Sequence, residues 1–202
     1  MAVFCTDPGH GGRDPGAVWQ NVLEKDLNLD VTLQLNEELK RRQHRILTSR
    51  KSDDNVPDLN TRCKLVNAHH RKRLPEFDAI VSVHCNVAAY RDPVSGGYVA
   101  NQNTRGFHVI YSQESVDGTY LAKCMATAAD QEGIVLHRGG RISTVELGRS
   151  LAWVHKTIPT AVLIELGFMT HPEELRMLRE NDYQRRLVRA IANGLDKFVS
   201  VS

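Results

Sequence analysis

The stretch AIVSVHCN, residues 79–86, is apolar and rich in β-branched side chains until it reaches His84. A short run of this kind is typical of a strand covered on both faces, as in a parallel sheet. Two further runs, AVFCT at 2–6 and TAVLIELGF at 160–168, have the same character. These three segments predict the centre of a mostly parallel β-sheet.

Outward from these strands, helix and strand signals alternate along the whole chain. The clearest helix runs from Leu23 to Arg42, with an apolar residue at every fourth position: Leu27, Val31, Leu35 and Leu39. Further strands are predicted at 45–50 and 106–111, and further helices at 60–70 (with Asn60 as cap), 116–132, 171–180 and 183–198. This alternation predicts one α/β domain over 1–202, a mostly parallel twisted sheet with helices on both faces.

Three connecting segments carry weaker signals. HRGGR at 137–141 predicts a turn because of its paired glycines. SLAWVHK at 150–156 predicts an edge strand, and residues 88–104 form the longest stretch without a regular pattern.

Composition excludes several function classes. The chain has 202 residues, of which 26 are Lys or Arg and 24 are Asp or Glu, so its net charge of +2 predicts no nucleic-acid partner. No apolar run approaches the roughly 18 residues of a membrane span, and MAVFCTD at 1–7 lacks the features of a signal peptide. We therefore expect a protein made in the cytoplasm. The four cysteines form no C-x-x-C pair, which predicts free buried thiols.

The loop TDPGHGGRDPGA, residues 6–17, places His10 among glycines and prolines directly after the first predicted strand. His84 and Glu165 lie near the ends of the two other core strands, and Glu24 lies in the first turn of the long helix. Because the carboxyl ends of parallel strands share one edge of a sheet, we expect these four side chains to meet.

Two histidines and a carboxylate are a common zinc set, and another carboxylate beside the open position would act as general base. Each residue also has a plainer interpretation: His10 as a turn residue, His84 as a hydrogen-bonded core residue, and Glu24 as a first-turn partner of the helix dipole. Glu165 is harder to explain structurally, because a carboxylate in an apolar strand is costly to bury.

Neighbouring residues on a strand face opposite sides, so we expect Cys85 to point away from the site. The other histidines are predicted to be surface or packing residues, with His137 as a weak candidate for supporting the site.

The chain resembles the zinc-dependent N-acetylmuramoyl-L-alanine amidases of the amidase-3 type. The resemblance spans Asp7 to Phe198 and rests on these stretches: DPGHGGRDPGA, LEKDLNLDV, ILTSR, VSVHCN, LIELGFMTHPEE and AIANGLDKF. It implies an α/β fold around a mostly parallel sheet and one Zn²⁺ held by His10, Glu24 and His84. It implies Glu165 as the catalytic glutamate and, as substrate, the amide between N-acetylmuramic acid and L-alanine in peptidoglycan.

Two departures leave the details of substrate recognition open: His171 replaces a common asparagine, and the segment HHRKRLPEF at 69–77 is longer than usual. No wall-binding repeat and no autoinhibitory helix insertion is evident. These features favour a phage-type lysin, acting as a monomer and kept in the cytoplasm until it is released to the cell wall.

Two alternatives remain open at this point. A zinc peptidase that cleaves the stem peptide would use the same metal chemistry. A catalytically inactive peptidoglycan-binding module is disfavoured, because a binder does not need Glu165.

Overall fold

The strand β5 (Ala79–Asn86) lies inside a six-stranded sheet and has parallel neighbours on both sides. The computed structural model describes residues 1–201. The sheet order is β4 (Arg45–Thr48), β1 (Val3–Pro8), β5, β10 (Ala161–Phe168), β8 (Phe107–Tyr111) and β9 (Leu136–Ser143). The first four strands are parallel, whereas β8 runs antiparallel to β10 and β9 runs parallel to β8. The predicted mostly parallel sheet is confirmed.

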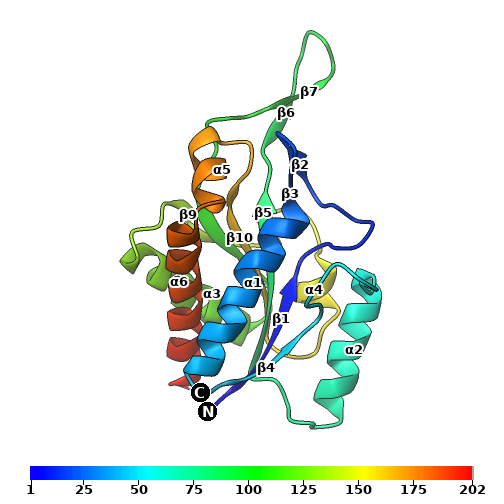
Figure 1. Ribbon diagram of the computed structural model, residues 1–202, viewed down its shortest axis with the longest axis vertical. Helices are drawn as coiled ribbons and strands as arrows, with labels where there is room; N and C mark the ends of the chain where they lie inside the picture. Colours follow the sequence, from blue (N-terminus) through cyan, green and yellow to red (C-terminus); the bar gives the residue numbers. More distant parts are fainter. Residues whose placement is uncertain (202) are drawn as a thin grey trace.

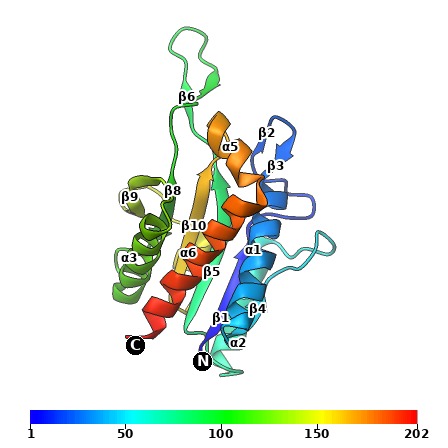
Figure 2. The same cartoon turned by 60° about the vertical axis from the view of Figure 1, so that its left-hand side comes forward.

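Helices cover both faces of this sheet (Figures 1 and 2). The larger layer contains α1 (Glu24–Arg41), α3 (Val116–Gln131) and α6 (Asn181–Val199). The opposite face carries α2 (Leu59–Arg71) and the short α4 (Ala152–His155), and α5 (Pro172–Leu178) follows β10. No helix among residues 1–201 has both the length and the apolar character to cross a membrane.

The alternation of side chains along each strand divides the core into two parts. Val81, Val83 and Cys85 of β5 pack in the large cluster with α1, α3 and α6. Ile80 packs in the smaller cluster with Cys63 of α2 and with residues of β1 and α4. Cys85 therefore faces away from the side on which Ile80 and His84 lie, as predicted. The four cysteines are free and buried, which also agrees with the prediction.

The four residues that define the apolar face of α1, Leu27, Val31, Leu35 and Leu39, are all buried. Their spacing of four places them on one stripe against the sheet. This stripe fixes α1 across β1 and β5, with its first residue at the carboxyl edge of both strands.

Two local predictions are wrong. Residues 137–141 belong to the edge strand β9, where a register shift opposite β8 accommodates Gly139 and Gly140, both with positive φ. The glycines therefore form a bulge in a strand rather than a turn. Residues 150–156 contain α4 instead of an edge strand, because β9 already occupies that edge and Trp153 is buried against the α2 side.

Two smaller differences concern a cap and a hairpin. The N-cap of α2 is Asp58, whose side chain accepts a hydrogen bond from the Thr61 amide, rather than Asn60. Within the stretch predicted to be irregular, β6 (Ala89–Arg91) and β7 (Tyr98–Ala100) form a separate two-stranded sheet. A third pair, β2 (Val18–Trp19) and β3 (Val22–Leu23), leads into α1.

Candidate metal centre and catalytic cleft

The carboxyl edge of the sheet brings the four predicted site residues together. β1 leads into the loop that carries His10, and β5 and β10 carry His84 and Glu165 at paired positions of the register. Glu24 is the first residue of α1, which starts over the same edge. All four residues line one cleft of about 1160 Å³.

Three of these residues form a compact cluster that could hold a metal ion. His10, Glu24 and His84 each offer one ligand atom, and these atoms lie within 4.8 Å of one another. The Glu24 carboxylate is central: its Oε2 lies 3.3 Å from His10 Nε2 and its Oε1 lies 2.9 Å from His84 Nδ1. Two imidazoles and a carboxylate are a donor set that suits Zn²⁺.

The electrostatics of the cluster favour a cation. Burial acts to raise the pKa of Glu24, but hydrogen bonds from His10 and His84 outweigh it and hold that pKa well below the ordinary value. Burial acts to lower the pKa of His10, but Glu24 and Asp14 raise it to about 9. The same negative charge that retains a proton on His10 would attract a metal ion in its place.

The loop holds His10 in an unusual backbone conformation. Its φ is 62°, a left-handed value that is uncommon outside glycine and that persists where surrounding contacts enforce it. Here Arg62 Nη2 donates to the His10 carbonyl at 2.6 Å, and the backbones of Gly11 and Asp14 pair with each other. Hydrogen bonds, rather than regular structure, therefore fix the position of His10.

Two glycines have no side chain in the space that His84 and Glu24 occupy. A Cβ on Gly9 would lie 2.2 Å from His84 Cε1, and one on Gly16 would lie 2.6 Å from Glu24 Oε2. No side chain tolerates such contacts, so both positions require glycine for His84 and Glu24 to keep their places.

Glu165 differs from Glu24 in its surroundings. It is buried, and within residues 1–201 no hydrogen-bond partner is present for its Oε2. Burial raises the pKa of Glu165 to about 7, although the charge of His84 opposes the increase. A buried carboxylate with a free acceptor and a pKa near neutrality can take up and release a proton, as general acid–base chemistry requires.

The sequence analysis did not identify the residues whose hydrogen bonds hold the His10 loop in place. Asp7 accepts hydrogen bonds from Arg62, Ser49 and Ser82, and Arg62 reaches the same loop from α2. Asp7 is part of the DPGH stretch and could have been singled out, but Arg62 resembles any other helix charge. Arg149, which also lines the cleft, gave no sequence signal.

The remaining histidines lie outside the cluster. His44 contacts Asp196, and His171 caps α5 by accepting a hydrogen bond from the Glu174 amide. His137 packs against His108 at 5.1 Å between ring centroids and is not among the residues that line the cleft. The geometry therefore gives no support to His137 as a residue of the site.

A mostly parallel α/β sheet with a His–Glu–His cluster in a cleft at its carboxyl edge defines a candidate metal-dependent hydrolase. The chain belongs to the amidase-3 type of the N-acetylmuramoyl-L-alanine amidase family, whose sequence model matches residues 5–197.

Individual relatives agree with this assignment. The chain is 26% identical over 210 residues to a germination-specific N-acetylmuramoyl-L-alanine amidase of Bacillus subtilis, covering 97% of this chain and 79% of that protein. It is 25% identical over 230 residues to the N-acetylmuramoyl-L-alanine amidase AmiC of Neisseria meningitidis, covering 99% of this chain and 53% of AmiC. A crystal structure of an N-acetylmuramoyl-L-alanine amidase from Clostridium difficile matches with a TM-score of 0.80 at 25% identity, covering 98% of this chain and 97% of that one.

Proposed function

We propose that this protein is a zinc-dependent amidase that hydrolyses the bond between N-acetylmuramic acid and L-alanine in peptidoglycan. The observation that carries the proposal is the convergence in one cleft of the His10–Glu24–His84 cluster and the buried Glu165, whose Oε2 has no hydrogen-bond partner among residues 1–201. Membership of the amidase family supports the choice of substrate.

The residues present fit a zinc ion. His10, Glu24 and His84 would hold it, and their donor atoms are already gathered within one small volume. Three protein ligands leave a position open, which is the arrangement of catalytic rather than structural zinc sites. When bound, the ion supplies Lewis-acid chemistry that polarises the amide carbonyl and makes water more acidic.

Glu165 would move the proton in this reaction. Its free Oε2 accepts a proton from the attacking water, whose oxygen adds to the carbonyl carbon. The same carboxyl group then donates this proton to the alanine nitrogen as the carbon–nitrogen bond breaks. A pKa of about 7 allows Glu165 to serve in both directions near neutral pH.

The test combines metal analysis with product analysis. We expect about one zinc per chain in purified protein, loss of activity with a chelator, and recovery when zinc is added. Digestion of purified sacculi should release intact stem peptides with a free N-terminal alanine, identified by mass spectrometry. Cleavage inside the stem peptide would instead establish a peptidase, and binding without cleavage would establish an inactive module.

The phage-type role and the cytoplasmic location before release stay predictions. They would be supported if cells that produce this chain lyse only when a membrane pore is co-expressed. Likewise, the monomeric state is a prediction that sedimentation analysis would test.

A further inference from the structure

A narrow hairpin, β6–β7, projects from the carboxyl edge of the sheet beyond the body of the molecule (Figures 1 and 2). It continues directly from β5, the strand that carries His84. The two residues at its base, Asn86 and Val87, line the cleft. Any polymer bound in the cleft and extending past this edge would therefore meet the hairpin.

The hairpin has a defined shape. The backbone N–H of Asn101 donates to the Ala88 carbonyl. The backbone N–H of Ala88 donates to Thr170 Oγ1, which connects the base of the hairpin to the segment after β10. At the tip, the Asp92 side chain accepts hydrogen bonds from the amides of Val94 and Ser95. These contacts define the path of the backbone at the base and at the tip of the hairpin.

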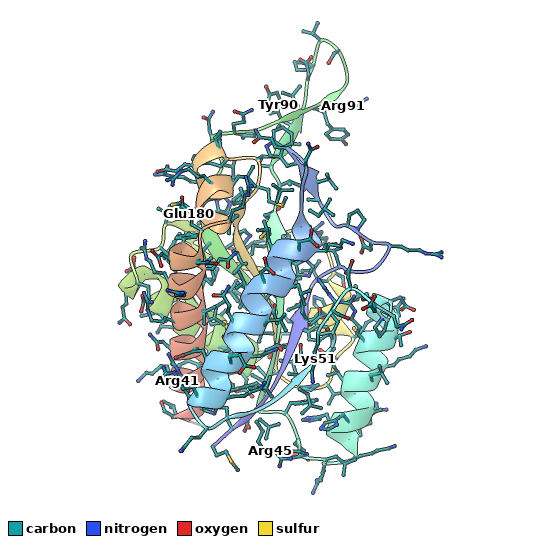
Figure 3. All side chains as sticks on the ribbon, in the orientation of Figure 1. Arg41, Arg45, Lys51, Tyr90, Arg91 and Glu180 are labelled. Atoms are coloured by element: carbon teal, nitrogen blue, oxygen red, sulfur yellow. The ribbon has the colours of Figure 1, made fainter. Side chains whose placement is uncertain are left out.

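Large apolar and aromatic side chains are exposed along this hairpin. Tyr98 is 82% exposed, Tyr90 is 52% exposed and Val94 at the tip is 93% exposed. Arg91 stands opposite Tyr98 in the register, and Tyr90 stands opposite Val99. Because successive residues alternate across a strand, the two tyrosines lie on opposite faces of the ribbon. Figure 3 shows Tyr90 and Arg91 on the hairpin, away from the core.

This arrangement disfavours a protein as the occupant. A stable protein interface buries about 800 Å² on each partner around a continuous apolar centre. The hairpin has three residues in each strand and one tyrosine on each face, so neither face offers such a patch. Tyr98 is paired with Arg91 and Tyr90 with Val99, so each face presents a single ring. Single exposed rings suit a sugar instead, because a pyranose presents apolar C–H groups on its faces and hydroxyl groups around its edge.

We propose that β6–β7 is a glycan-binding arm that stacks Tyr90 and Tyr98 on sugar rings of neighbouring peptidoglycan glycan strands. A ring on each face lets the arm enter between two strands of the wall, while the adjoining cleft receives the amide. The face of an aromatic ring carries partial negative charge and attracts the C–H groups of a sugar, and stacking removes apolar surface from water. This inference rests on the proposed function, because peptidoglycan is the substrate assumed there.

The test separates polymer binding from catalysis. In the Glu165→Gln background, which leaves the polymer intact, we expect Tyr90→Ser/Tyr98→Ser to reduce co-sedimentation with purified sacculi by roughly tenfold. Tyr90→Phe/Tyr98→Phe should bind like the parent, because it retains both rings. Val94→Ser is the control, since it removes an exposed apolar side chain of the same hairpin without removing a ring.

When the same two serine substitutions are made in the enzyme that retains Glu165, the variant should cleave a soluble muramoyl-L-alanine peptide at the parental rate. Equal binding of sacculi by the parent and the double serine variant would contradict the proposal that the hairpin binds glycan strands. So would equal loss of binding in Val94→Ser, or loss of self-association in the double serine variant, which would indicate a second copy of the chain as the occupant. Failure of the parent to cleave the soluble peptide and sacculi would instead overturn the proposed function.

Discussion

Asp14 holds the imidazole of His10 from the side opposite Glu24. Its Oδ2 lies 2.8 Å from His10 Nδ1, while His10 Nε2 faces the Glu24 carboxylate at 3.3 Å. The hydrogen bond assigns the proton to Nδ1 and leaves Nε2 to act as a ligand atom. Carboxylate–histidine pairs of this kind orient metal ligands and increase their basicity.

We therefore expect Asp14→Ala to weaken zinc binding by roughly 10–100-fold without unfolding the protein. Titration against a chelator of known affinity measures this change, and excess zinc should restore activity. Asp54→Ala, at an exposed site of a neighbouring loop, is the control and should bind zinc like the parent. Unchanged zinc affinity in Asp14→Ala would contradict the orienting role.

The buried ion pair between Arg62 and Asp7 should contribute strongly to stability. Arg62 Nη1 lies 2.9 Å from Asp7 Oδ1, and both side chains are almost fully buried. Arg62→Met leaves the Asp7 carboxylate buried without its positively charged partner, which costs about 3–5 kcal/mol. Urea denaturation measures the loss. Arg189→Met breaks an ion pair with Glu132 at the surface and should cost less than about 1 kcal/mol.

The parts of the molecule that sequence reasoning predicted are those with repeated, local signals. β5 and β10 were recognisable from continuous apolar residues, and the apolar residue at every fourth position from Leu27 to Leu39 located α1. The parallel arrangement then placed His84, Glu165 and the His10 loop at one edge.

What the sequence could not predict depends on contacts between distant segments. β9 contains two glycines that resemble a turn, and only pairing with the free edge of β8 makes it a strand. Likewise, the hydrogen bond from Arg62 to the His10 carbonyl joins residues 52 positions apart. Nothing near Arg62 in the sequence indicates that α2 reaches the loop.

The buried histidine His108 should make stability dependent on pH. Burial lowers its pKa from the ordinary 6.5 to about 4, so the folded protein binds fewer protons than the unfolded chain between these values. Stability contributed by neutral His108 is complete above about pH 6.5 and is lost as the pH falls toward 4.

The shift corresponds to on the order of 3 kcal/mol across that window. Denaturation at a series of pH values measures it. His108→Gln should show a flatter decline below pH 6.5 than the parent, and parallel profiles for the two proteins would rule out this source of acid sensitivity.

Gly9 should be essential to the site although it carries no functional group. Gly9→Ala places a Cβ within 2.2 Å of the His84 ring, so the ring must move out of the cluster. We expect a loss of zinc binding with the secondary structure retained, measured by metal analysis and circular dichroism. Gly97→Ala is the matched control, because its Cβ would meet only Ser95 Oγ at 3.5 Å. Normal zinc content in Gly9→Ala would show that the cluster tolerates displacement of His84.

Two of the buried glutamates, Glu165 and Glu174, have opposite expected roles. The Oε2 of Glu165 in the cleft has no hydrogen-bond partner in the described part of the chain, whereas Glu174 accepts hydrogen bonds from the backbone amides of Phe168 and Gly106. Glu165→Gln removes the group that transfers the proton and should lower kcat by roughly 10²–10⁴-fold while zinc content and stability stay near parental values. Glu174→Gln places an amide donor where two backbone N–H groups need acceptors, so it should reduce stability and leave zinc content unchanged.

Zinc analysis, thermal denaturation and assays on sacculi distinguish these two outcomes. His10→Ala serves as the third reference, because it should lose the metal itself. If Glu165→Gln digested sacculi at the parental rate, general acid–base catalysis would have to come from another group. If it lost zinc as His10→Ala does, Glu165 would be a ligand and not the proton carrier.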